Sequence, residues 1–157
     1  MAERSVIHST FVIERSYPAT PERVFAAFAD PFLKRRWFAQ GEGRDVEEFE
    51  MDFRVGGAER SRFRLKEGTP LPGAVFTNDA WYLDITPNHR VVIASTMALG
   101  DTRISASLTT FEFLPAGQET DLVFTHQGVF FEGADGPQMR EAGWGYLLDQ
   151  LAVELAR

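Results

Sequence analysis

The sequence has no cysteine and only three histidines among its 157 residues. Without cysteine the chain forms no disulfide and supplies no thiolate for catalysis or metal binding. The histidines lie at positions 8, 89 and 126, so none lies four residues from another, as a helical metal-ligand pair requires. No Gly-x-Ser-x-Gly motif marks a nucleophilic serine. We therefore expect no metal site, no cofactor and no serine nucleophile of that kind.

Long apolar runs and an excess of positive charge are also missing. No stretch approaches the ~20 apolar residues that a membrane-spanning helix needs. The first residues, "MAERSVIHSTFVIERSY", alternate instead of forming the apolar core of a signal peptide. The formal net charge is −7, which is opposite to the cationic surface that binds a phosphate backbone. We therefore expect a cytoplasmic protein, a single domain over residues 1–157, with no membrane or nucleic-acid partner.

The charged residues that are present have the patterns of solvent-exposed faces. The basic residues 34–36 are interpreted as a solvated helix face. Acidic residues alternate with apolar ones between positions 47 and 52, which is typical of a strand with one solvated face. A catalytic carboxylate pair is the alternative, although no spacing requires one. Arg54 is expected to pair with Asp52 or another carboxylate at that corner, beside a tight turn at Gly56 and Gly57 that needs positive φ.

The order of predicted elements is one strand, two short helices, six strands and one long helix. Residues 5–17 alternate as a strand. Thr20 and Pro21 have the residue types of a helix start, and residues 31–38 continue as a second short helix. From Arg44 to about Gln127, six alternating segments are separated by turn-forming clusters, as in an antiparallel meander. After Asp135 the pattern stays helical to the end of the chain.

This order predicts an α+β fold in which a curved sheet surrounds the last helix. A single antiparallel sheet of about six or seven strands tends to curl. Trp144, Leu148, Leu151 and Leu155 form one apolar stripe along the last helix, which needs a partner surface. The concave face of the sheet is the obvious partner, and a cavity can remain between the two layers. The 14 phenylalanines can pack this core or line such a cavity.

The chain resembles a known family in five segments that follow one another in the family's order. These segments are "TPERVFAAFADPFLKRRWF", "MDFRVGGAERSRF", "YLDITPNHRVVIAS", "TTFEFLPAGQETDLVFTHQGV" and "GWGYLLDQLAVEL". They are similar to the homologues of the activator of the heat-shock-protein-90 ATPase, which are often described as polyketide-cyclase-like and belong to the START-like (SRPBCC) superfamily. The resemblance covers nearly the whole chain and implies the helix-grip fold.

The resemblance implies three kinds of function, because fold alone does not determine activity. Some members of the family bind apolar small molecules, and this is our main hypothesis: an apolar or aromatic ligand held between sheet and long helix. The second is an enzyme of cyclase, dehydratase or hydrolase type that uses the same cavity. The third is a module that activates a chaperone ATPase, which the lack of a second module in this chain disfavours. A homodimer through an edge strand is also compatible with the sequence.

The candidate ligand-binding residues are aromatic or lie beside the predicted cavity. Trp144 is flanked by Gly143 and Gly145, and glycine inside a helix costs about 1 kcal/mol relative to alanine. These glycines therefore either bring the helix close to the sheet or leave space above a ligand. The predicted binding residues are Trp37, Phe38, Phe76, Trp81, Phe111, Phe124, His126, Trp144 and Leu148.

Polar groups in the cavity are expected to be few. His126 shares one strand face with Leu122 and Phe124, so it faces the cavity if they do. A hydrogen-bonded core histidine is the favoured interpretation, and a general acid or base is the alternative. Asp79 and Arg64 are further candidates, and Asp79 faces inward only if Trp81 does.

Overall fold

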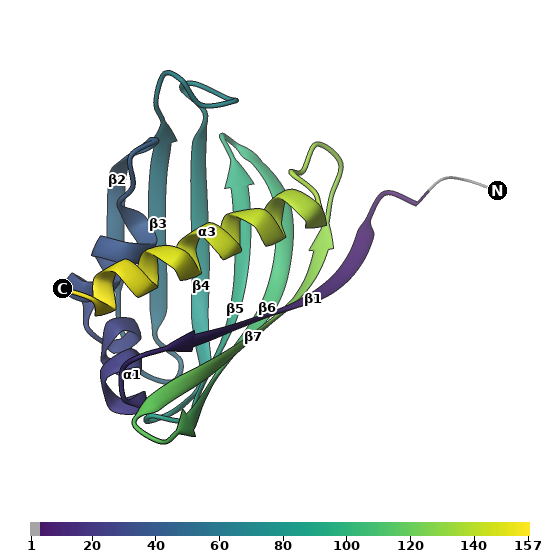
Figure 1. Ribbon diagram of the computed structural model, residues 1–157. Helices are drawn as coiled ribbons and strands as arrows, with labels where there is room; N and C mark the ends of the chain where they lie inside the picture. The colour runs from purple at the N-terminus through teal and green to yellow at the C-terminus, as the bar shows by residue number, and fades with distance from the viewer. Residues whose placement is uncertain (1–3) are drawn as a thin grey trace.

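The computed structural model describes residues 4–157 and arranges them as one curved antiparallel sheet with helices on its concave side (Figure 1). The elements are β1 (Ile7–Tyr17), α1 (Pro21–Ala29), α2 (Pro31–Lys34), the π-helical turn η1 (Arg35–Ala39), β2 (Arg44–Met51), β3 (Ala58–Leu65), β4 (Val75–Thr86), β5 (Arg90–Leu99), β6 (Thr102–Ala116), β7 (Glu119–Phe130) and α3 (Pro137–Leu155). This is the predicted α+β helix-grip fold.

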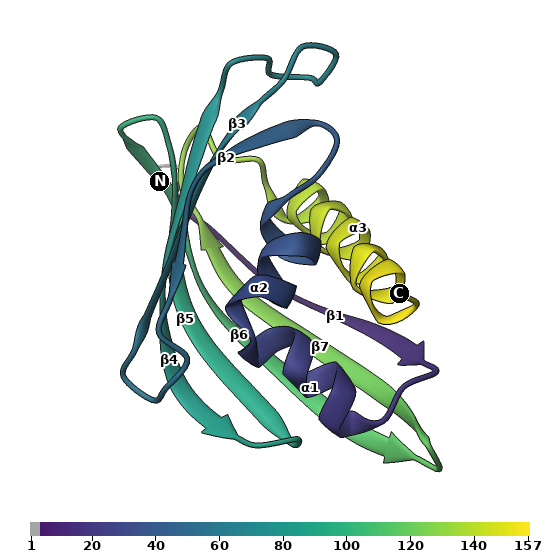
Figure 2. The same cartoon turned by 90° about the vertical axis from the view of Figure 1, so that its left-hand side faces the viewer.

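Strands β2 to β7 form the predicted meander, and β1 pairs with β7 as one of the two edge strands. The sheet order is β1-β7-β6-β5-β4-β3-β2, with antiparallel neighbours throughout. Viewed from the side, the sheet curves around the helices, which all lie on one face (Figure 2). Among residues 4–157 no helix is long and apolar enough to span a bilayer.

The predicted local signals at the first helix and at the β2–β3 turn are confirmed. Thr20 Oγ1 accepts a hydrogen bond from the amide of Arg23 at 3.3 Å, as an N-cap does. Gly56 has a φ of +85°, the left-handed conformation that glycine tolerates best. Arg54 Nε lies 2.6 Å from Asp52 Oδ2, so the expected ion pair forms at this corner.

Helix α3 crosses the concave face and buries the predicted stripe. Leu148, Leu151 and Leu155 are buried, and Trp144 packs against the same core while remaining half-buried. The hydroxyl of Tyr17 on β1 donates to the carbonyl oxygen of Leu148 at 2.8 Å, which anchors the middle of the helix to the sheet. Figure 1 shows the helix lying diagonally across strands from both halves of the sheet.

The basic residues 34–36 are not a solvated face, so that interpretation was wrong. Lys34 is buried, and Arg36 donates to both carboxylate oxygens of Glu154 at 2.8 and 2.6 Å. The reason is that α2 and η1 pack between the sheet and α3, where positive charges meet carboxylates on both neighbours. Such a packing position cannot be seen in a charge pattern alone.

Candidate functional site

A cavity of about 310 Å³ lies between the concave face of the sheet and helix α3. Strands β3 to β7 supply its floor, η1 supplies one wall, and the first half of α3 covers it. Of the predicted residues, six line this cavity: Trp37, Phe38, Phe76, Phe111, His126 and Trp144. Sequence periodicity and aromatic content therefore identified the larger aromatic part of the cavity wall but not its polar and charged residues.

The aromatic side chains of the cavity form two groups. Trp144 lies at the centre of the first group, with its ring centroid 5.7 Å from that of Phe38 and 5.8 Å from that of Phe111. Phe63 and Phe76 form the second group on β3 and β4, nearly parallel and 5.6 Å apart. Aromatic side chains commonly adopt tilted, edge-to-face or offset-stacked pairs at such centroid distances, so both groups are well-packed apolar surfaces.

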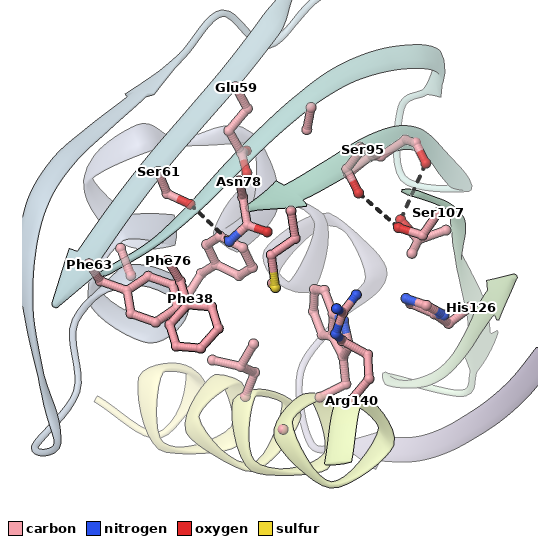
Figure 3. A pocket seen from close by; sticks show the side chains of 18 of the residues that line it. Phe38, Glu59, Ser61, Phe63, Phe76, Asn78, Ser95, Ser107, His126 and Arg140 are labelled. Atoms are coloured by element: carbon pink, nitrogen blue, oxygen red, sulfur yellow. Dashed lines mark hydrogen bonds between the residues drawn. The ribbon is translucent and has the colours of Figure 1, made fainter. Parts of the chain in front are cut away.

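A band of uncharged polar side chains crosses the floor between these rings. Asn78 Nδ2 donates to Ser61 Oγ at 3.5 Å, and the hydroxyls of Ser95 and Ser107 are 2.9 Å apart. Thr109 is paired in register with His126, so the band reaches from β3 to β7 (Figure 3). The band adds hydrogen-bonding capacity to the floor without adding charge.

His126 stands at the β7 end of this band and is almost completely buried, with 1% of its surface exposed. Its ring is parallel to that of Phe11, with centroids 4.7 Å apart. Nδ1 has no hydrogen-bond partner among residues 4–157. Burial, together with the positive charge of Arg140, lowers the pKa of His126 to about 4, so the imidazole is neutral at pH 7.

Gly128 makes room for this imidazole. A Cβ atom at Gly128 would lie 2.8 Å from Cε1 of His126 and 3.1 Å from Cε2 of Phe130. Both distances are shorter than ordinary van der Waals contact, so a larger residue would displace one of the two rings. The sequence thus keeps a glycine in a strand, where it is otherwise unfavourable, next to the buried histidine.

Arg140 enters the cavity from α3 close to His126 and was not predicted. Its guanidinium donates to both carboxylate oxygens of Asp135 at 2.8 and 2.9 Å and to Ser105 Oγ at 2.9 Å. The side chain is buried and lies over the ring of Phe130. The burial of Arg140 could have been predicted from the sequence, because it precedes Trp144 by four residues and therefore extends the buried stripe of α3.

Lys34 and Glu59 form a second buried charged group, at the wall made by α2 and β3. Lys34 Nζ lies 2.6 Å from Glu59 Oε1, and the hydroxyl of Tyr82 donates to the same oxygen. Alternation along β3 places Glu59 on the same face as Ser61 and Phe63, which was the available signal. In both buried groups, Lys34 with Glu59 and Arg140 with Asp135, the cation is paired with a carboxylate. Neither group therefore presents an unpaired charge to the cavity.

The mouth of the cavity explains one of the two helical glycines. A Cβ atom at Gly143 would meet nothing within 4 Å, and Gly143 lines the cavity. A Cβ atom at Gly145 would lie 3.6 Å from Arg15 Nη2, an ordinary contact. Gly143 is exposed and borders open space at the rim of the cavity, whereas nothing around Gly145 requires a glycine. Met139 and Tyr146, both exposed, stand beside Gly143 at this mouth.

Three predicted residues lie away from the cavity surface. Phe124 and Leu148 are fully buried in the core behind it, and the ring of Phe124 packs 4.6 Å from that of Trp144. The placement of Trp81 was wrong: its strand turns Phe76, Asn78 and Ala80 inward, so Trp81 faces outward and is 45% exposed.

Two polar candidates are excluded from the cavity by the same alternation. Asp79 accepts from Arg60 Nη1 at 2.8 Å, and Arg64 donates to Glu47 at 3.0 Å, both on the outer face of the sheet. Glu47 and Glu48 of β2 are therefore partners in surface ion pairs, on the solvated face that the acidic pattern indicated. Pairs of this kind contribute at most about 1 kcal/mol each.

Residues 18–156 match the family model described as "Activator of Hsp90 ATPase homolog 1-like protein". The chain is 49% identical to the Mll3558 protein of Rhizobium loti, with a TM-score of 0.84 over 96% of this chain and 99% of that one. It is 41% identical to a protein of Rhizobium leguminosarum, with a TM-score of 0.90 and 99% of both chains covered. An AHSA1-like protein of Aeromonas hydrophila, 20% identical, shares the fold with a TM-score of 0.70 over 94% of this chain and 92% of that one. No protein of curated function matches the chain.

Proposed function

We propose that this chain, which belongs to the family of activator of Hsp90 ATPase homolog 1-like proteins, binds an apolar small molecule in the cavity beneath α3. The observation that carries the proposal is the cavity of about 310 Å³ itself. Small-molecule sites occupy roughly 300–1,000 Å³ and combine apolar walls with a few polar groups. The cavity lies at the lower end of that range, which favours a compact ligand.

Small side chains create this space. Ser61, Ser95 and Ser107 on three strands, Ala80 on a fourth and Gly143 on α3 line the cavity. Protein interiors normally leave few voids larger than a water molecule. Larger apolar residues at these positions would fill the gap and add packing energy, so their absence supports a binding role.

The lining favours an aromatic ligand that carries oxygen or nitrogen substituents. The rings around Trp144 provide flat apolar surface, and the band from Ser61 to Thr109 provides donors and acceptors without net charge. The side chains of this band already bond to one another or to the backbone, and a ligand with oxygen or nitrogen atoms can also use their remaining donors and acceptors.

His126 fits this binding role better than acid–base catalysis. A general base works best when its pKa lies near the pH of the reaction. The pKa of His126 is lowered to about 4, which makes the imidazole a weak base at neutral pH. A neutral imidazole still donates one hydrogen bond and accepts another, so we assign His126 to ligand recognition.

Binding of the fluorescent amine N-phenyl-1-naphthylamine, an uncharged aromatic probe, tests this function. Saturable binding at one site is expected. Trp144→Ala should weaken it about tenfold or more, because ring contacts and buried apolar area are both lost. Trp81→Ala is the matched control, since it removes the same side chain from the outer face of the sheet.

Both variants must show the far-ultraviolet circular dichroism of the unmodified protein before the affinities are compared. The proposal fails if the folded protein gives no saturable signal. It also fails if Trp81→Ala reduces affinity as much as Trp144→Ala, since binding would then not depend on the cavity.

A further inference from the structure

Three cationic side chains other than histidine line the cavity, and they differ in how their charge is balanced. Lys34 is paired with Glu59, and Arg140 is paired with Asp135. Arg44 forms no ion pair with any carboxylate among residues 4–157. Its guanidinium is half-buried, and Glu42, two residues earlier in the chain, is exposed. Arg44 thus brings an uncompensated positive charge to the cavity.

Backbone and ring contacts hold the Arg44 guanidinium in place without neutralising it. Nη2 donates to the carbonyl oxygens of Phe38 at 2.8 Å and of Gln40 at 3.4 Å, at the end of η1. The guanidinium carbon lies 5.0 Å from the ring centroid of Phe63. Burial lowers the pKa of Arg44, yet an arginine stays protonated at any physiological pH. Its remaining N–H groups have no protein acceptor among the described residues.

Tyr146 brings a hydroxyl group to the same place from α3. A Cβ atom at Gly41 would lie 3.1 Å from Arg44 Nε and 3.6 Å from Tyr146 Oη, so both polar groups converge on this glycine. The hydroxyl of Tyr146 makes no hydrogen bond within residues 4–157, and its side chain is exposed at the mouth. Two donors, one from β2 and one from α3, are therefore available to bind one acceptor.

We propose that the ligand is an apolar acid whose anionic group binds Arg44 and Tyr146 at the mouth while its apolar body lies in the cavity. This inference rests on the proposed function and specifies the ligand class. An anionic oxygen would replace water at a half-buried cation, where hydrogen bonds are charge-assisted and less screened than at an open surface. The net charge of −7 repels anions at long range, so recognition has to come from this local pair.

Two probes with a common ring system separate the anionic contribution from the apolar one. 8-Anilinonaphthalene-1-sulfonate carries a sulfonate, and N-phenyl-1-naphthylamine lacks it. Arg44→Gln should weaken binding of the sulfonate about tenfold to hundredfold, as expected for losing a hydrogen bond between charged groups. The same change should alter affinity for the neutral amine by less than about twofold.

Three further variants make the result specific to the mouth. Tyr146→Phe should weaken only sulfonate binding, by several-fold, because it removes one hydroxyl. Arg44→Lys should retain part of the preference, since it keeps the charge but loses the planar fork. Arg103→Gln removes the same charge from an exposed side chain outside the cavity lining and should leave both affinities unchanged.

The outcomes distinguish this inference from the proposed function. If the neutral amine binds but Arg44→Gln leaves sulfonate binding unchanged, or weakens both probes equally, anion recognition by Arg44 is overturned and the apolar site stands. If neither probe binds the folded, unmodified protein, both proposals fail. Equal losses with Arg44→Gln and Arg103→Gln would also overturn the inference, because only net charge would then matter.

Discussion

The ammonium group of Lys34 lies 2.6 Å from a carboxylate oxygen of Glu59, and both side chains are buried beside the cavity. The same oxygen accepts a hydrogen bond from Tyr82, so α2, β3 and β4 are joined through one carboxylate. Lys34 also lies 4.8 Å from the ring centroid of Phe38, next to the cavity wall. This network fixes the short helices against the sheet and so determines how much space remains for a ligand.

Breaking the Lys34–Glu59 pair should destabilise the fold strongly. Glu59→Gln leaves a buried ammonium without its counter-charge, and removing one partner of a buried pair costs about 3–5 kcal/mol. Urea denaturation monitored by circular dichroism measures the free energy of unfolding. Arg54→Gln is the control, because it breaks an exposed pair and should cost at most about 1 kcal/mol. Equal effects of the two changes would show that the buried pair does not stabilise the fold.

Stability should fall between pH 6.5 and pH 4 because of His126. Its pKa is about 4 in the folded protein and 6.5 in the unfolded chain, so the unfolded state binds more protons within this window. The contribution of the neutral imidazole is complete above pH 6.5 and is lost as the pH falls towards 4. The loss is on the order of 3 kcal/mol in the free energy of unfolding.

The comparison with His126→Phe isolates this effect from the titration of carboxylates. The variant keeps an aromatic ring beside Phe11 but cannot be protonated, so urea midpoints at pH 7 and pH 4.5 should differ less than in the unmodified protein. His89→Gln, in the exposed β4–β5 turn, should retain the full acid sensitivity. An acid sensitivity that is the same with and without the His126 imidazole would contradict this assignment.

Filling the space at Gly143 should block the cavity without weakening the helix. Gly143→Leu places a side chain where a Cβ atom now meets nothing within 4 Å. Leucine is a better helix former than glycine by up to about 1 kcal/mol, so the fold should be at least as stable. Affinity for N-phenyl-1-naphthylamine is expected to fall about tenfold or more.

Ala142→Leu is the matched control for this obstruction. Ala142 is exposed on α3 and does not line the cavity, so leucine there should leave affinity unchanged. Fluorescence titration with N-phenyl-1-naphthylamine gives the dissociation constants of both variants for comparison. Unaltered affinity of a folded Gly143→Leu protein would mean that the ligand neither enters past Gly143 nor binds next to it.

The fold was predictable because its signals are local or periodic. Thr20 and Pro21 begin a helix wherever they occur in such a pattern, and Gly56 permits a turn through its own backbone. The stripe ending at Leu155 identified the buried face of α3 from spacing alone. The resemblance to the family supplied the arrangement of the sheet around that helix, which periodicity does not specify.

The site was predicted only in part, because its polar groups depend on tertiary partners. Lys34 looks like a surface charge until β3 brings Glu59 to it, and Arg140 looks like one until β6 brings Ser105 to it. Trp81 shows the opposite error. It is aromatic, but strand alternation places it with Asp79 on the outer face, and residue type alone favoured the wrong side.

Methyl spectra of the methionines test most directly whether the cavity holds the ligand. The chain has four methionines, of which Met97 and Met139 line the cavity, while Met51 packs against the core outside it. With [¹³C-methyl]methionine-labelled protein, titration with N-phenyl-1-naphthylamine should shift the Met97 and Met139 signals with one common dissociation constant and leave Met51 in place. Saturable binding that leaves both the Met97 and the Met139 signals unmoved would contradict binding in the cavity beneath α3.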